Sequence, residues 1–294
     1  MVKQSLADKM FVFIVYAMLI LVLITVLYPL IFVLVASISD PGKVVNGEVW
    51  LWPEGITFRG YEKVFQNKDI MSGYMNTILY TLIGTCVNLV MTICAAYPLS
   101  RKELYGRGFV TALFVFTMFF SGGLIPSYFL VKKLGMLNTM WALIIPNAVA
   151  VWNIIIMRTF FQQSIPGEVQ ESAQIDGCSN LQILLRVVLP LSLPILAVMT
   201  LFYGVGHWNS FFNALIYLTD RDKYPLQLVL REILIQNNMK DMVASSEESL
   251  AKTVMEAESI KYAVVIIANL PVLLLYPFLQ RYFTKGLTIG AVKG

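Results

Sequence analysis

Long stretches without a charged side chain constrain this sequence more than any other feature. Six apolar segments of roughly 20 residues or more contain no Asp, Glu, Lys or Arg. They cover about residues 11–37, 72–99, 109–130, 138–157, 191–217 and 262–280. Stretches of this length cross a bilayer as helices, because backbone in lipid must satisfy its hydrogen bonds within the segment. The sequence therefore predicts an all-α polytopic membrane protein with six transmembrane helices.

The composition supports the same class of protein. The 294 residues are 57% hydrophobic and 14% charged, with a mean hydropathy of +0.70. That is too little charge to cover a soluble domain of this size. The first segment exceeds the apolar region of a cleaved signal, about 7–15 residues long, so we expect it to remain as an anchor in the lipid bilayer. A small, scattered net charge of +4 predicts no nucleic-acid partner.

The distribution of basic residues favours one orientation in the membrane. If the N- and C-termini are both cytoplasmic, the inner segments carry ten Lys and Arg against five Asp and Glu, and the outer segments carry twelve against thirteen. Short inner loops rich in Lys and Arg carry the positive-inside signal. This orientation makes residues 38–71 and 218–261 extracytoplasmic and places the loop between the fourth and fifth segments in the cytoplasm.

Motifs for catalysis and for cofactor binding are missing from the sequence. HExxH, GxSxG and GxxxxGK[ST] do not occur, so no zinc protease, serine hydrolase or phosphate loop for ATP is predicted. The three cysteines are an odd number without CxxC spacing, which favours neither a disulfide framework nor a zinc site. We therefore expect no catalytic residue, no metal and no cofactor in this chain.

One polar cluster interrupts the fifth apolar segment. It contains His207, the single histidine, and two asparagines, Asn209 and Asn213, whose i, i+4 spacing places them on one stripe of a continuous helix. Two interpretations remain open: these groups hydrogen-bond neighbouring helices, or they line a pathway for a polar, uncharged ligand. The pathway hypothesis names His207, Asn209 and Asn213, together with Pro126 near an expected kink in the third segment.

A polar island, ESAQIDGCSN, separates two apolar runs. Glu171 and Asp176 are five residues apart and point about 140° from one another on a helix, so they cannot act as a catalytic pair. Gly177 is a natural helix end because glycine accepts the left-handed conformation. Ser179 and Gln182 have the spacing of a capping box for a second helix. The island therefore predicts a helix-turn-helix whose surface suits docking into a groove of another protein.

The same island resembles the EAA loop of ABC importer permeases. The match rests on Glu171, Ala173, Asp176, Gly177, Leu189, Pro190 and Pro194, while Ser172 and Cys178 stand where alanine is usual. NTILYTLIGT, AAYPLSR and the tail KGLTIGAVKG are similar to sugar-importer permeases related to the maltose system's second permease. SGGLIPSYFLVKKLGMLNTMWAL and FYGVGHWNSFFNALIYL are similar to the narrower group of lipoprotein or putative aldouronate oligosaccharide transporter permeases.

The resemblance implies the type I ABC importer transmembrane fold and a bacterial permease subunit that moves oligosaccharides across the cytoplasmic (inner) membrane by alternating access. It also implies the partners: a second, homologous permease in a heterodimer, two ATP-binding subunits that hold ATP and Mg, and an extracytoplasmic solute-binding protein. By matching motif, the residues that couple this chain to the ATPase are Glu171, Ala173, Asp176 and Gly177. ATPase activity would then reside in partner chains.

The expected organisation has three parts. Residues 1–71 form the N-terminal helix and an extracytoplasmic loop, residues 72–284 form the permease core with the coupling loop at 161–190, and residues 285–294 form a cytoplasmic tail. Two alternatives stay open. One is an ABC importer permease for another solute, and the other is an ATP-independent secondary carrier, for which His207 is the single ionisable candidate inside the helices.

Overall fold

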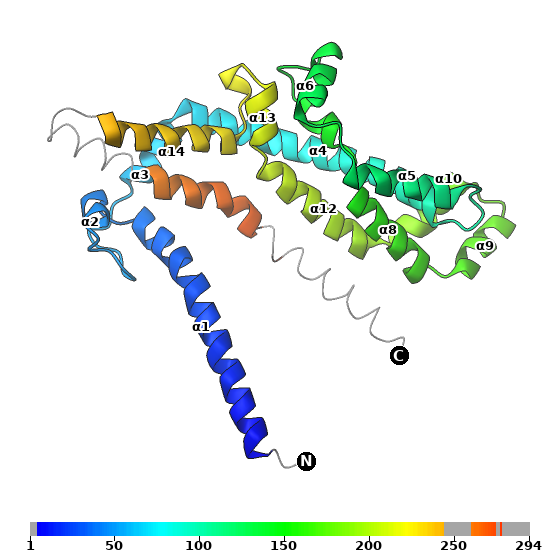
Figure 1. Ribbon diagram of the computed structural model, residues 1–294, viewed down its shortest axis with the longest axis horizontal. Helices are drawn as coiled ribbons and strands as arrows, with labels where there is room; N and C mark the ends of the chain where they lie inside the picture. The colour runs from blue at the N-terminus through cyan, green and yellow to red at the C-terminus, as the bar shows by residue number, and fades with distance from the viewer. Residues whose placement is uncertain (1–4, 244–259, 275–276, 278–294) are drawn as a thin grey trace. The chain divides into compact units, whose positions relative to one another are not determined.

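The computed structural model describes residues 5–243, 260–274 and 277, and it divides into two units. Among the described residues, one unit contains those within 1–68 and 230–270, and the other contains those within 69–229 and 271–294. All regular structure in the described ranges is helical, which confirms the all-α prediction (Figure 1).

The first unit begins with one long apolar helix. α1 spans Leu6–Ser37, starts with a capping box between Ser5 and Asp8, and continues through Pro29. Its apolar stretch has no buried residue, so its surface suits lipid or another apolar partner. The short helices α2 (Pro41–Val45) and α3 (Arg59–Gln66) follow. Within this unit the ring of Phe32 packs edge-on against Tyr262 of an apolar helix, Ile260–Leu274.

The second unit contains most of the helices. Their bounds are α4 Lys68–Ser100, α5 Arg107–Phe119, α6 Leu124–Lys133, α7 Trp141–Ile144, η1 Ile145–Asn147, α8 Val151–Ser164, α9 Gly167–Ile175, α10 Asn180–Ile183, η2 Leu184–Val188, α11 Leu189–Leu191, α12 Leu193–Trp208, α13 Phe212–Tyr217, η3 Arg221–Lys223 and α14 Leu226–Val243. η1 and η3 are 3₁₀ helices and η2 is a π-helix. From Leu230 onward, α14 belongs to the first unit.

Three of the predicted apolar segments are divided in the structure. Among the described residues, α1 and α4 are each long and apolar enough to cross a membrane by themselves. The pairs α5 with α6, α7–η1 with α8, and α10–α11 with α12 pass the same test only together, and they bend by 111°, 53° and 83°. The segments 109–130 and 138–157, each predicted as one helix, are therefore divided in two. The segment 191–217 is divided at residues 209–211, between α12 and α13. These elements amount to up to five spans, so the total of six stays a prediction.

Glycine and proline account for the breaks. Gly122 and Gly123 separate α5 from α6, and Gly123 has a positive φ of 83° that favours glycine. Pro146 lies within η1, before the break that precedes α8, where its missing N–H removes a helical hydrogen bond. Pro190 and Pro194, which also lack an N–H, lie on either side of the break before α12.

Some predicted segments cannot be compared with the structure. The tail at 285–294, residues 244–259 of the expected loop at 218–261, and residues 275–276 and 278–280 of the sixth apolar segment lie outside the described residues.

α4, α8 and α12 pack side by side around one apolar core (Figure 1). Ala96 of α4, Met157 of α8 and Met199 of α12 are completely buried there, together with Ile183 of α10. Close packing of this kind holds the helices in fixed relative positions. The core therefore fixes the end of this unit from which α9 extends.

At the same end, side chains of α8 donate hydrogen bonds to the last carbonyls of α4. Arg158 Nε donates to the Leu99 carbonyl at 3.0 Å, and Gln162 Nε2 donates to the Ser100 carbonyl at 3.3 Å. The last carbonyls of a helix have no partner within it, and a cation near them also complements the helix dipole. α8 thus supplies hydrogen bonds that α4 cannot make for itself.

Candidate functional site

α9 ends in a tight glycine turn. Gly177 has a φ of 79°, its N–H donates to the Gln174 carbonyl at 3.0 Å, and the Cys178 N–H donates to the Ala173 carbonyl at 3.0 Å. These two bonds define a Schellman motif, in which the residue with positive φ is usually glycine. No atom lies within 4 Å of the position that a Cβ would take at Gly177, so backbone conformation rather than space demands glycine here.

The chain restarts at once as α10. The Ser179 N–H donates to Gln182 Oε1 at 2.8 Å, and Ser179 Oγ accepts from the Gln182 N–H at 3.4 Å. This is the capping box that the sequence predicts at these two residues. The local structure thus follows from local sequence, and its role in docking stays a prediction.

The two sides of α9 differ in what they contact. Ala173 is half-buried and packs, with Cys178, against the apolar core of this unit. Glu171 and Asp176 are exposed, and Ile175 between them is 86% exposed. The exposed surface of α9 is therefore an apolar side chain flanked by two carboxylates. Ala173 instead packs against the core of its own chain.

Sequence reasoning missed Ile175. An isolated isoleucine within the small and polar residues of ESAQIDG was the available signal. A large, exposed apolar side chain indicates a protein–protein contact site when it belongs to a surface that a partner can cover.

A pocket of about 410 Å³ lies beside α9. Its lining combines Arg101 and Lys102 from the loop after α4 and Arg107 from the start of α5 with Glu171 and Gln170 from α9. Gln170 Oε1 is buried there without a hydrogen-bond partner. Because the lining carries both signs of charge, this pocket selects neither an anion nor a cation.

The structure gives His207 a fixed partner on another helix. Its Nε2 lies 2.6 Å from Asn88 Oδ1 of α4. The ring comes so close to Gly84 that a Cβ there would lie 2.5 Å from His207 Nε2. One turn earlier, Tyr203 Oη lies 2.6 Å from Thr92 Oγ1. These contacts match the interpretation that the polar groups of α12 hydrogen-bond a neighbouring helix.

Asn209 and Asn213 do not share a helical stripe, so that prediction is wrong. α12 ends at Trp208, and Asn209 is its C-cap, with Nδ2 donating to the Val205 carbonyl at 3.1 Å. Asn213 belongs to the separate helix α13. Pro126 lies in the first turn of α6, on an exposed part of that helix. The residues named for the pathway therefore belong to α6, to α12 with its C-cap, and to α13.

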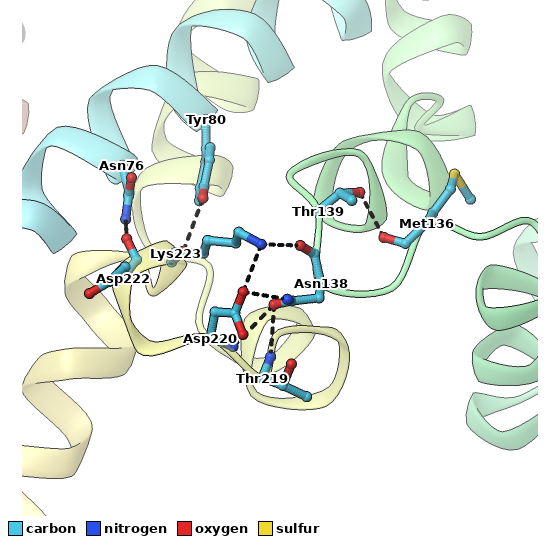
Figure 2. A network of polar contacts seen from close by, with 9 residues as sticks. All are labelled: Asn76, Tyr80, Met136, Asn138, Thr139, Thr219, Asp220, Asp222 and Lys223. Carbon is cyan, nitrogen blue, oxygen red and sulfur yellow. Dashed lines mark hydrogen bonds and ion pairs between the residues drawn. The ribbon is translucent and has the colours of Figure 1, made fainter.

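Figure 2 shows a polar network near the start of α4, far along that helix from α9. Asn138 has a φ of 60°, and its Oδ1 accepts from the N–H groups of Thr219 and Asp220 at 3.2 and 3.1 Å. Its Nδ2 donates to Asp220 Oδ2 at 2.6 Å. Lys223 Nζ donates to the same oxygen at 2.8 Å and to the Asn138 carbonyl at 3.0 Å. Hydrogen bonds from Lys223 and Asn138 lower the pKa of the Asp220 carboxyl.

Two side chains of α4 attach this network to the helix. Tyr80 Oη donates to the Lys223 carbonyl at 3.0 Å, and Asn76 Nδ2 donates to the Asp222 carbonyl at 2.7 Å (Figure 2). A third, Thr77 Oγ1, accepts from the Leu226 N–H at 2.8 Å. Sequence reasoning missed these contacts because about 150 residues separate the partners.

A metal centre is not assembled by the part of the chain that the structure describes. Within those residues no three His, Cys, Asp or Glu side chains lie together as metal ligands. The polar contacts are hydrogen bonds and ion pairs that hold helices and loops.

Known proteins are similar in sequence to this chain over most of its length. A family model described as the inner membrane component of binding-protein-dependent transport systems matches residues 69–289. Protein LplC of Bacillus subtilis (strain 168) is 42% identical over 271 residues, covering 92% of this chain and 90% of that protein. The polygalacturonan/rhamnogalacturonan transport system permease protein YtcP of the same organism is 40% identical over 292 residues, covering 98% and 99%. The melibiose/raffinose/stachyose import permease protein MelC, also from this organism, is 28% identical over 268 residues, covering 90% and 91%.

A solved structure shares the fold. It is a crystal structure of a bacterial ABC transporter involved in the import of the acidic polysaccharide alginate. One of its chains is similar with a TM-score of 0.86 and 32% sequence identity, covering 95% of this chain and 99% of that one. The described helices thus have the arrangement of an ABC importer permease of type I.

Proposed function

The chain belongs to the family of binding-protein-dependent transport system inner membrane components, and we propose that it imports acidic oligosaccharides as one permease of an ATP-driven complex. The family and the relatives make it a membrane permease of the sugar and oligosaccharide ABC importers, which is not itself a catalytic subunit. The further elements of the proposal are alternating access, a second homologous permease, two ATP-binding subunits that hydrolyse ATP with Mg, and an extracytoplasmic solute-binding protein. In this proposal both termini face the cytoplasm.

The substrate class rests on one observation, the gradient of identity among relatives with named sugars. The relative named for polygalacturonan and rhamnogalacturonan is 40% identical, and the alginate importer chain is 32% identical. The relative named for melibiose, raffinose and stachyose, which are neutral sugars, is 28% identical. Polygalacturonan and alginate both carry sugar carboxylates, so we favour oligosaccharides of uronic acids over neutral ones.

Uptake measurements test this substrate class. The complete transporter, reconstituted in proteoliposomes with its binding protein, is expected to import oligogalacturonates and to leave raffinose outside. Import of raffinose without oligogalacturonates would refute the acidic class and keep the permease function. A complex that hydrolyses ATP without importing either sugar under these conditions would count against the proposed function itself.

The docking surface on α9 supports coupling to an ATPase. Ile175 is 86% exposed and stands between the exposed carboxylates of Glu171 and Asp176. This pattern suits an apolar pocket with basic residues at its rim, since the apolar centre of an interface provides affinity and the charges orient it. In this proposal Ala173 and Gly177 act indirectly. Ala173 anchors α9 to the core, and Gly177 permits the turn after it.

Truncation of the exposed isoleucine tests the docking surface. Complete burial of an isoleucine contributes about 1.5–3 kcal/mol, so Ile175→Ala should weaken binding of the ATP-binding subunits at least about ten-fold. Val169→Ala is the matched control on the same helix, because Val169 is only 40% exposed. Its expected effect is less than about three-fold. Affinity is measured by titrating the purified permease pair with ATP-binding subunits, and equal effects of the two substitutions would contradict this surface.

An ATP-independent secondary carrier finds no support in these comparisons. That alternative depends on His207 as an ionisable residue that carries a coupling ion. The family is named for dependence on a binding protein, and His207 has a neutral amide partner in Asn88. We expect His207→Gln to leave uptake unchanged, and abolished uptake in that variant would revive the carrier.

A further inference from the structure

Asn88 lies at a junction of three segments inside the membrane-spanning part. It belongs to α4 and is 1% exposed. Its Nδ2 donates to the Asn147 carbonyl of η1 at 2.6 Å, and its Oδ1 lies 2.6 Å from His207 Nε2 of α12. A carbonyl can only accept, so the first bond fixes which way the amide points. His207 Nε2 must therefore carry the proton in the second bond.

Both partners of Asn88 lie at interruptions of a helix. Asn147 is the last residue of η1, and the regular helix α8 resumes only at Val151. His207 is the residue before the end of α12, after which residues 209–211 are not helical. Backbone groups at an interruption lack their helical partners, and at membrane depth a side chain must replace them. Asn88 supplies that replacement at Asn147 and reaches the second interruption with its other atom.

A second contact between α4 and α12 provides a contrast. Thr92 and Tyr203 are 0% and 7% exposed and bond at the same distance of 2.6 Å. Both belong to regular parts of their helices, and their bond joins α4 to α12 alone. The Thr92–Tyr203 bond holds two helices together, whereas Asn88 also connects two sites at which the backbone can bend.

We propose that Asn88 is a positioning residue that makes the interruptions at residues 148–150 and 209–211 move together during alternating access. This inference rests on the proposed transport function. Broken helices in transporters move as segments about their interruptions. While Asn88 holds both partners, one interruption cannot rearrange without either moving the other or losing one of the two hydrogen bonds of Asn88. Removal of Asn88 would let the two ends of the pathway open independently, so that ATP is hydrolysed without transport.

The test compares two substitutions at the same helix contact. The complete transporter is reconstituted in proteoliposomes, and the ATP hydrolysed per oligogalacturonate imported is measured. We expect Asn88→Ala to raise this ratio about ten-fold, which corresponds to the loss of coupling between two sites. Tyr203→Phe, which removes a bond between the same helices, should change the ratio less than two-fold. If both substitutions raise the ratio equally, or if neither does, Asn88 has no special role.

A second pair of variants decides the matter if Asn88→Ala does not assemble. His207→Gln keeps an N–H donor near the position of Nε2, whereas His207→Ala removes it. The expected result is a normal ratio for glutamine and a ratio raised about ten-fold for alanine. Equal ratios for the two variants would overturn the inference. Failure of the unmodified transporter to import any sugar would instead overturn the proposed function, and this inference with it.

Discussion

α4 carries two polar networks that differ in their access to water. Near its start, Asn76 and Tyr80 hold a loop with the exposed carboxylate of Asp220 (Figure 2). Farther along, Asn88 and Thr92 bond the side chains of His207 and Tyr203 and are 1% and 0% exposed. The first network contains a carboxylate and an ammonium group, whereas Asn88 and Thr92 carry no charge. The first network should therefore respond to pH and salt, and the second to changes in shape.

Of the changes that test this contrast, a methyl group added at Gly84 is expected to lower the stability of the protein most. Its Cβ would lie 2.5–2.8 Å from three atoms of the His207 ring, so the ring or α12 must shift. Overpacking of this kind costs about 1–3 kcal/mol, and we place Gly84→Ala near the upper end of that range. Gly206→Ala is the control, because no atom lies within 4 Å of its Cβ position on the partner helix. Thermal unfolding of the purified permease in detergent measures both, and equal midpoints would contradict the close approach.

Substitutions of Asn138 are expected to have the next largest effect. Asn138→Ala removes three side-chain hydrogen bonds and keeps a Cβ at a φ of 60°, so it should destabilise by about 2 kcal/mol. Asn138→Gly removes the same bonds but tolerates the backbone, so its cost should be about 1 kcal/mol. Chemical denaturation in mixed micelles provides the comparison. A glycine variant less stable than the alanine variant would show that φ is not the constraint.

Acid should loosen the exposed network before the buried one. The folded-state pKa of Asp220 is lowered from its ordinary value of 3.8, so its contribution is present above that value and is lost as pH falls through the lower folded value. Hydrogen exchange of residues 217–224, corrected for intrinsic rates, should accelerate below about pH 4, while exchange of residues 84–92 stays unchanged. Asp220→Asn should remove this acceleration. Equal acid sensitivity in both segments would contradict the assignment of Asp220.

Salt is expected to have the smallest effect. Arg221 Nε lies 2.9 Å from Asp69 Oδ2, and their side chains are 53% and 43% exposed. An exposed pair contributes about 0–1 kcal/mol and is screened by ions, so Arg221→Gln should cost less than about 0.5 kcal/mol in 0.5 M salt. Stability is compared at low and high salt. A loss of more than 1 kcal/mol at high salt would show that this pair is shielded from solvent.

Local sequence predicted local structure well. The positive φ at Gly177 and the capping box of Ser179 and Gln182 follow from residues within a few positions of one another, and both are present. Long-range geometry could not be predicted in the same way. Nothing near Ala173 says that it faces the core while Ile175 faces outward, because that depends on where α8 and α10 lie. The stripe predicted for Asn209 and Asn213 failed because α12 ends at Trp208 and Asn213 belongs to the separate helix α13.

The sequence by itself determined that this chain is helical, that it belongs in a membrane and that its polar island forms a helix, a glycine turn and a capped helix. Hydropathy and capping act over a few turns, so they can be identified from neighbouring residues. Only the tertiary structure decided which partner each buried polar group has. Asn88 and His207 are 119 residues apart, and their bond exists because Gly84, which has no side chain, lets the His207 ring of α12 approach α4 closely.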